Sequence, residues 1–126
     1  MSAKKIRVLV IDDSALMRQL IREILESDPC IEVIGTAGDP YAAREKILAL
    51  KPDVLTLDVE MPKMDGIETI RSLRKINTKA HILVVSALAD KATAIQALKE
   101  GAQGFLYKPF KETELIEAIE EILGGQ

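Results

Sequence analysis

The sequence is poor in the residues that cross-link small folds. Among its 126 residues there is one cysteine, Cys30, and no tryptophan. A single cysteine excludes an internal disulfide and a cysteine-rich structural zinc site. No run of five like charges marks a charged tail. The hydrophobic core alone must therefore hold the fold, and a chain of this length buries roughly two-thirds of its unfolded surface.

Membrane and nucleic-acid signals are also missing. No apolar stretch approaches the roughly 20 residues that span a bilayer, and the first residues, Met1–Lys5, have no cleavable-signal pattern. The 17 basic and 20 acidic side chains give a net charge of −3, which argues against a nucleic-acid-binding patch. We therefore expect one domain over residues 1–126, in a cytoplasmic, reduced and monomeric protein without membrane or nucleic-acid partners.

What the chain does have is a regular alternation of apolar runs and helical segments. The predicted strands are Ile6–Ile11, Ile31–Thr36, Val54–Leu57, His81–Val85 and Phe105–Tyr107. The predicted helices contain the apolar stripes of Leu16–Leu25 and Leu115–Leu123, and the segments Pro40–Leu50, Gly66–Ile76 and Lys91–Glu100. The strands are near-continuous apolar runs, as in parallel sheets buried on both faces. Five strand–helix repeats predict an α/β, doubly wound, five-stranded parallel sheet.

Polar residues follow four of the predicted strands directly. Asp12 and Asp13 follow the first strand, Asp58 the third, Ser86 the fourth and Lys108 the fifth. Ligands of open parallel sheets bind at the carboxyl ends of the strands. Each residue alone is more often a cap, a turn residue or a solvated side chain. Together they predict a polar site at one edge of the sheet.

The chemistry of this set favours a metal ion and a phosphoryl group. Three crowded carboxylates repel one another unless a cation or a proton is bound. Mg²⁺ prefers oxygen ligands and takes one or two carboxylates together with waters and a phosphate. A carboxylate is also a nucleophile that forms an aspartyl phosphate. The ammonium of Lys108 and the hydroxyl of Ser86 suit the phosphoryl oxygens.

At these residues the sequence resembles the receiver domain of two-component response regulators of the chemotaxis type, from Lys5 to Leu123. The segments that carry the resemblance are Val10–Ser14, Leu57–Gly66, Val85–Ala87, Gly101–Ala102 and Tyr107–Phe110. Each segment is weak evidence alone, but their order and spacing together are very specific. The resemblance implies a flavodoxin-like (βα)5 fold with the strand order 2-1-3-4-5.

The resemblance also implies a role for each acid. Asp58 takes the position of the phosphoacceptor. Asp13, Asp58 and the backbone carbonyl of Glu60 take the positions that bind Mg²⁺ directly, and Asp12 acts mostly through water. By the same resemblance Ser86 and Lys108 contact the phosphoryl group, the bond between Lys108 and Pro109 is cis, and Phe105 is the switch aromatic.

The implied function is a phosphorylation-dependent switch rather than an enzyme, apart from its own phosphotransfer and dephosphorylation. The implied phosphodonor is a histidine kinase. The single histidine, His81, is expected to be a surface side chain, so the phosphohistidine belongs to that partner. The output is a contact with a downstream protein, or an output domain missing from this chain, through the face of the fourth helix, fifth strand and fifth helix.

Two halves of the chain resemble different chemotaxis proteins. Asp13–Gln19 and Asp53–Pro62 are similar to the receiver of the chemotaxis methylesterase, whereas Gly104–Phe110 is similar to single-domain chemotaxis regulators. An excised methylesterase-type receiver, a stand-alone regulator and a composite sequence all remain open.

Other functions with this topology are weaker alternatives. An Mg²⁺-dependent phosphohydrolase with an aspartate nucleophile has a second aspartate where Glu60 stands. A nucleotide or flavin carrier needs a phosphate cradle after the first strand, where Asp12 and Asp13 would repel the anion. A constitutive pseudo-receiver would lack phosphorylation residues that are all present here.

Overall fold

A computed structural model describes residues 5–58, 66–76, 79–87 and 91–124 of the chain. Strands and helices alternate throughout, as the sequence predicts. The elements are β1 (Ile6–Ile11), α1 (Ala15–Glu26), β2 (Ile31–Ala37), α2 (Pro40–Leu50), β3 (Val54–Leu57), α3 (Gly66–Lys75), β4 (His81–Ser86), α4 (Lys91–Lys99), β5 (Gly104–Tyr107) and α5 (Glu112–Gly124). No helix among the described residues is long and apolar enough to cross a membrane.

The five strands form one parallel sheet in the order β2-β1-β3-β4-β5, which confirms the predicted architecture. The predicted bounds differ from the observed ones by one residue at a few ends. Strand β2 ends at Ala37 and β4 includes Ser86, while β5 begins at Gly104. Ser86 thus lies on the last position of its strand rather than in the following loop.

Strand β2 contains one extra residue relative to its neighbour. Val8 of β1 pairs with Val33, but the next residue, Leu9, pairs with Gly35, so Ile34 has no partner position in β1. This irregularity is a β-bulge, which locally interrupts the ladder of hydrogen bonds. It lies in a strand at one edge of the sheet.

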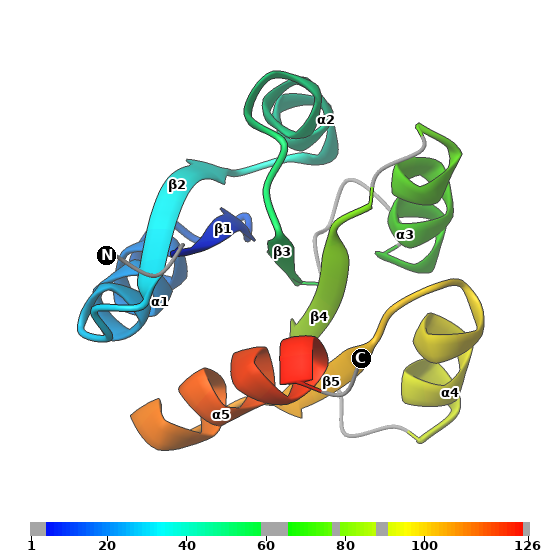
Figure 1. Cartoon of the computed structure of the whole chain (residues 1–126). Coiled ribbons are helices and arrows are strands. Elements are labelled where there is room, and N and C mark those ends of the chain that lie inside the picture. The colour runs from blue at the N-terminus through cyan, green and yellow to red at the C-terminus, as the bar shows by residue number, and fades with distance from the viewer. Residues whose placement is uncertain (1–4, 59–65, 77–78, 88–90, 125–126) are drawn as a thin grey trace.

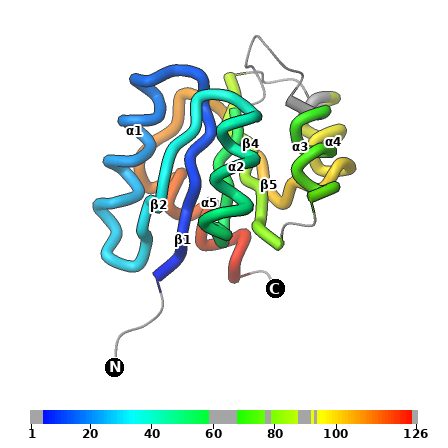
Figure 2. The backbone as a smooth tube through the Cα atoms, turned by 90° about the horizontal axis from the view of Figure 1, so that it is seen from above, coloured from blue at the N-terminus to red at the C-terminus, as the bar shows by residue number. Residues whose placement is uncertain are grey.

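Helices cover both faces of the sheet and enclose two apolar clusters (Figure 1). On one face, α1 and α5 pack on a cluster that includes Ile21, Leu25 and Leu115. On the other face, α2, α3 and α4 pack on a cluster that includes Ile47 and Ile70. Figure 2 shows α3 and α4 side by side at one end of the molecule and α1 at the other. The sheet is therefore buried on both sides, as its continuous apolar strands require.

Local signals begin and end the helices. The Ser14 hydroxyl accepts a hydrogen bond from the Met17 N–H and caps α1. Asp39 caps α2 in the same way, with Pro40 as the first helical residue. Gly101, just beyond α4, has a φ of +122°, a conformation that favours glycine.

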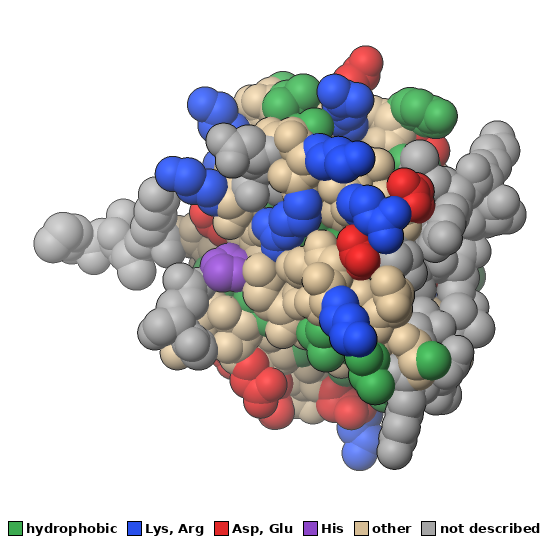
Figure 3. Space-filling view, turned by 90° about the vertical axis from the view of Figure 1, so that its right-hand side faces the viewer, with side chains coloured by type: hydrophobic (Ala, Val, Ile, Leu, Met, Phe, Trp, Pro, Cys, Tyr) green, Lys and Arg blue, Asp and Glu red, His purple; other side chains and the backbone are tan. Residues whose placement is uncertain are grey.

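Charge is distributed unevenly over the surface. Figure 3 shows Lys and Arg side chains gathered on the face of α2, α3 and α4. Exposed basic residues in this half are Arg44, Lys51, Arg71, Lys75, Lys79 and Lys99. The exposed acids of α5 are Glu112, Glu114, Glu117, Glu120 and Glu121. Exposed Glu45 and Glu68 also lie on α2 and α3, so this face has an excess of basic residues, whereas the charged residues of α5 are all acidic.

Candidate functional site

The carboxyl ends of β1 and β3 place three aspartates next to one another. The Asp12 N–H donates to the Ala37 carbonyl at 3.0 Å, and the Asp58 N–H donates to the Ile11 carbonyl at 3.0 Å. Both aspartates thus continue the strand ladders by one residue beyond the sheet. Their backbones are fixed by the same hydrogen bonds that hold the strands together.

The three carboxylates form a compact cluster. One oxygen from each of Asp12, Asp13 and Asp58 lies within 4.8 Å of the other two. Asp12 is 2% exposed and Asp58 is 5% exposed, whereas Asp13 is open to solvent. Burial makes the repulsion between Asp12 and Asp58 strong because little water screens it. A hard, oxygen-preferring divalent cation such as Mg²⁺ fits this donor set.

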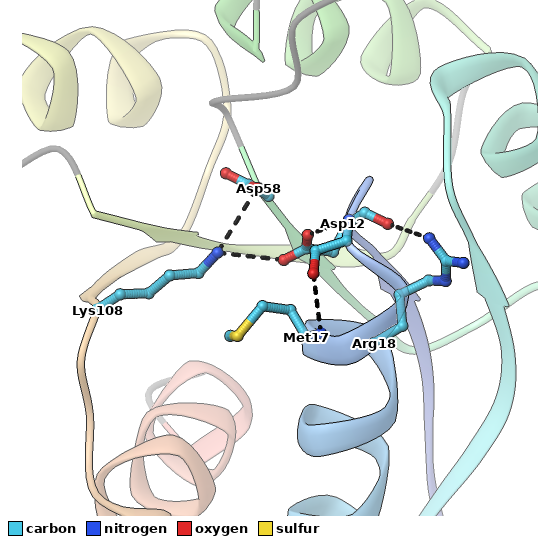
Figure 4. Close-up of polar contacts among 6 residues, drawn as sticks. Asp12, Met17, Arg18, Asp58 and Lys108 are labelled. Carbon is cyan, nitrogen blue, oxygen red and sulfur yellow. Dashed lines mark hydrogen bonds and ion pairs between the residues drawn. The ribbon is translucent and has the colours of Figure 1, made fainter.

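Lys108 supplies one positive charge to the cluster (Figure 4). Its Nζ lies 3.2 Å from Oδ2 of Asp12 and 3.6 Å from Oδ2 of Asp58. The residue directly follows β5, and its N–H donates to the Ser86 carbonyl at 2.8 Å. The peptide bond from Lys108 to Pro109 is cis, as the resemblance implies. One ammonium against three carboxylates leaves an excess of negative charge at the site.

Every polar group of Asp12 takes part in a hydrogen bond. Its Oδ1 accepts the Ser14 N–H at 2.9 Å, and its Oδ2 accepts from the Lys108 ammonium. Its backbone carbonyl accepts a hydrogen bond from Nη1 of Arg18 at 2.7 Å (Figure 4). The sequence pattern does not predict this role for Arg18. In the sequence, Arg18 is only a charged residue between the apolar positions of α1.

Ser86 and Phe105 lie on neighbouring strands beside the cluster. Ser86 is completely buried at the end of β4 and pairs with Tyr107 of β5. Phe105 is half-buried and packs against the apolar cluster beneath α2, α3 and α4. Its ring lies 4.9 Å, centre to centre, from that of Tyr107, which is exposed. An aromatic pair thus links the site edge of β5 to the surface.

Two further expectations concern Glu60 and His81. Glu60 lies outside the residues that the structure describes. His81 is half-buried and still reaches the surface (Figure 3), although its Nδ1 atom is inaccessible to solvent. His81 begins β4, and Ser86 ends it, so the histidine lies at the opposite end of the sheet from the aspartates.

Comparisons with known proteins agree on one type of domain. A family model described as the response regulator receiver domain matches residues 8–120. The protein-glutamate methylesterase/protein-glutamine glutaminase 1 of Hahella chejuensis is 49% identical over 122 residues, which are 95% of this chain and 33% of that protein. The chain thus spans about a third of the length of this curated relative.

Solved structures show the same similarity in three dimensions. The response regulator domain of Thermotoga maritima CheB has a TM-score of 0.83 and 39% identity, with 96% of each chain covered. CheY in the CheX-CheY-BeF3-Mg+2 complex from Borrelia burgdorferi has a TM-score of 0.88 and 28% identity, covering 95% of this chain and 90% of that one.

Proposed function

The chain belongs to the family of response regulator receiver domains, which are phospho-accepting switches, and on this premise we propose that Asp58 accepts the phosphoryl group. The observation that carries this proposal is the position of Asp58 within the cluster. Its carboxylate is buried beside two other acids and one ammonium. Asp12 is also buried at a strand end beside Lys108, so the resemblance of the segment Leu57–Gly66 to receiver domains supports the choice of Asp58 between the two.

Receiver domains bind Mg²⁺ at an acidic pocket, and we propose that this chain does so through Asp13 and Asp58. Asp12 would act through a water molecule, and the Glu60 carbonyl would be the remaining protein ligand. The clustered carboxylates support this assignment, since their oxygens are the ligand type that Mg²⁺ takes. When bound, the ion neutralises charge on the acids and on the phosphoryl oxygens.

The transfer step follows from these positions. A carboxylate oxygen of Asp58 attacks the phosphorus of a phosphohistidine on the donor kinase. The phosphorus–nitrogen bond breaks as the phosphorus–oxygen bond forms, and the imidazole leaves and takes up a proton. This reaction depends on positioning and charge neutralisation more than on covalent catalysis. The location of His81 at the far end of β4 supports a donor histidine in the partner.

Ser86 and Lys108 are the proposed contacts of the transferred group. Lys108 already lies 3.6 Å from Asp58, so its ammonium is placed to pair with a phosphoryl oxygen there. Ser86 ends the neighbouring strand, and its backbone is tied to that of Lys108. Both residues thus connect the phosphoryl group to β4 and β5.

The proposed response travels along β5 to the surface of α4, β5 and α5. Attraction of Ser86 toward the phosphoryl oxygens would free space near Phe105, whose ring then turns inward. Phe105 has no hydroxyl, so packing alone would stabilise the inward state. The phosphoryl group acts by biasing this two-state equilibrium. A partner at this surface would meet the acidic exterior of α5.

We propose that the chain acts in chemotaxis signalling in the cytoplasm, as one monomeric domain over residues 1–126. The methylesterase relatives support an origin as the receiver of a methylesterase-type protein. The similarity to CheY supports a stand-alone regulator that binds a downstream protein. In either case the chain itself is the switch, and any methylesterase activity would belong to a further domain.

The deciding experiment is phosphorylation of the chain by acetyl phosphate with Mg²⁺. We expect a mass increase of one phosphoryl group that is labile to hydroxylamine, and its loss in Asp58→Asn. Asp28→Asn, a substitution in the loop before β2, is the matched control and should still be labelled. Labelling of the Asp58→Asn variant would refute the assignment.

A further inference from the structure

We propose that Arg18 is a positioning residue for the metal-binding acids, which it holds in place through the Asp12 carbonyl. This inference rests on the proposed Mg²⁺ site and assigns it a supporting side chain. Arg18 itself contacts neither a phosphoryl group nor the ion.

The hydrogen bond of Arg18 acts on the peptide that joins two of the acids. Its Nη1 donates to the Asp12 carbonyl oxygen at 2.7 Å. That carbonyl belongs to the peptide unit between Asp12 and Asp13, so fixing it also fixes the direction in which the chain enters Asp13. Figure 4 shows the guanidinium reaching this carbonyl from α1, on the side away from Lys108.

The carboxylate and the N–H of Asp12 have other hydrogen-bond partners, so Arg18 alone among the described contacts holds its carbonyl. Its carboxylate is held by the Ser14 N–H and by Lys108, and its N–H by the Ala37 carbonyl. These bonds orient Asp12 itself. Asp13 is exposed, and among the described contacts the Arg18 bond is the one made to the peptide carbonyl that precedes it. Without this bond the peptide would be less restrained, and the Asp13 carboxylate would occupy several orientations. Mg²⁺ binding, which uses this carboxylate, would then be weaker.

Gly38 makes room for the guanidinium. A Cβ atom on Gly38 would lie 2.9 Å from Nη1 and 3.5 Å from Cζ of Arg18. Arg18 therefore lies against the connection between β2 and α2 while it bonds the connection between β1 and α1. A side chain at position 38 would displace the guanidinium, which is the mobile end of a flexible residue, without touching any acid.

Charge and position predict opposite effects of removing Arg18. A guanidinium near the acids repels Mg²⁺, so its loss alone would strengthen binding. The loss of an outer hydrogen bond that orients metal ligands typically weakens binding about 10- to 100-fold. We expect the positional effect to dominate, because the guanidinium is bonded to a carbonyl and is not paired with a carboxylate in the described contacts.

The test is calorimetric titration of the whole chain with MgCl₂. We expect Arg18→Met to raise the Kd for Mg²⁺ about tenfold and Arg18→Lys, which keeps a donor, to restore part of the affinity. Arg22→Met is the matched control, since Arg22 lies one turn further along α1 and pairs with Glu26 instead. It removes the same charge from the same helix and should leave the Kd within about twofold of the parent value.

Gly38→Ala provides a second route that leaves Arg18 in the sequence. It should also raise the Kd, but it should have no further effect in the Arg18→Met background, because both changes break the same contact. A parent chain that binds no Mg²⁺ would refute the metal site and this inference together. A parent that binds, with unchanged or tighter binding in both Arg18→Met and Gly38→Ala, would refute the role of Arg18 alone.

Discussion

Asp58→Asn should not destabilise the protein in the absence of metal, although Asp58 is paired with a lysine. At an effective dielectric constant of about 20, the Asp58–Lys108 attraction at 3.6 Å is about 4.6 kcal/mol. An Asp12 oxygen lies within 4.8 Å of one of Asp58, so this repulsion is at least about 3.5 kcal/mol on the same scale. Asp13 is exposed, and at bulk-water screening its repulsion within the same distance is at least about 0.9 kcal/mol.

The attraction therefore exceeds the repulsion by at most a few tenths of a kcal/mol, and the desolvation of the buried Asp58 carboxylate then decides the sign. An asparagine of the same shape removes that cost. Lys108 is not left without a counter-ion, because Asp12 remains 3.2 Å away. We therefore expect the free energy of unfolding to rise by about 1 kcal/mol, which corresponds to a Tm increase of about 4 °C.

The assay is urea unfolding of parent and variant, first in EDTA and then in Mg²⁺. At ten times its Kd, Mg²⁺ should stabilise the parent by about 1.4 kcal/mol, and the variant by less. Asp53→Asn is the control, since its carboxylate accepts the Arg7 N–H at the other end of β3 and should not alter the response to Mg²⁺. A loss of more than about 1 kcal/mol for Asp58→Asn in EDTA would refute the crowding argument.

Four further outcomes are expected. Thr56→Val should raise the free energy of unfolding by about 1–2 kcal/mol in urea unfolding, because the Thr56 hydroxyl is buried without a hydrogen-bond partner among the described residues; no gain would contradict this. A hydrogen bond from Arg71 lowers the pKa of Glu100 below its usual 4.5, so this pair stabilises the protein above pH 4.5 and is lost as the pH falls below it. Glu100→Gln should therefore flatten the acid limb of a stability–pH curve, and an unchanged limb would count against the pair. Lys108→Ala should still be labelled by acetyl phosphate but lose the chemical-shift response of α4 and β5 to beryllofluoride; a normal response would remove its coupling role. The resemblance to receiver domains implies that Leu88, two residues after Ser86 and outside the described residues, borders the approach of the water that attacks the phosphoryl group. Decay of the phosphoryl label should be slow in the parent and faster in Leu88→Glu or Leu88→Gln, because leucine cannot hold that water; equal decay, or loss within seconds in the parent, would disprove this.

Periodicity predicted the architecture because this sheet is buried on both faces. The end of a continuous apolar strand is visible in the sequence as the first polar residue, and in β1, β3 and β5 the residue after the strand faces the site. That is why the sequence alone predicts that Asp12, Asp58 and Lys108 lie together, as they do in the fold. The ligand at position 60 and the water contact at position 88 stay predictions.

Hydrogen bonds from long side chains to backbone carbonyls escaped prediction because no local pattern encodes them. Arg74 donates to the carbonyls of Ala80 and Gly101, 2.9 and 2.7 Å away, and its burial lowers its pKa. The bond between Arg18 and the Asp12 carbonyl is of the same kind. Each depends on where a long side chain ends after the helices have packed.

The irregular pairing of β2 has a consequence for how copies of this chain meet. An open sheet can recruit an extra strand at either edge, and regular edges favour aggregation. Here one edge strand carries the unpaired Ile34, and the other, β5, has only four residues. A long added strand would find no continuous ladder on either side. Edge-to-edge joining of copies through β2 or β5 is thereby discouraged.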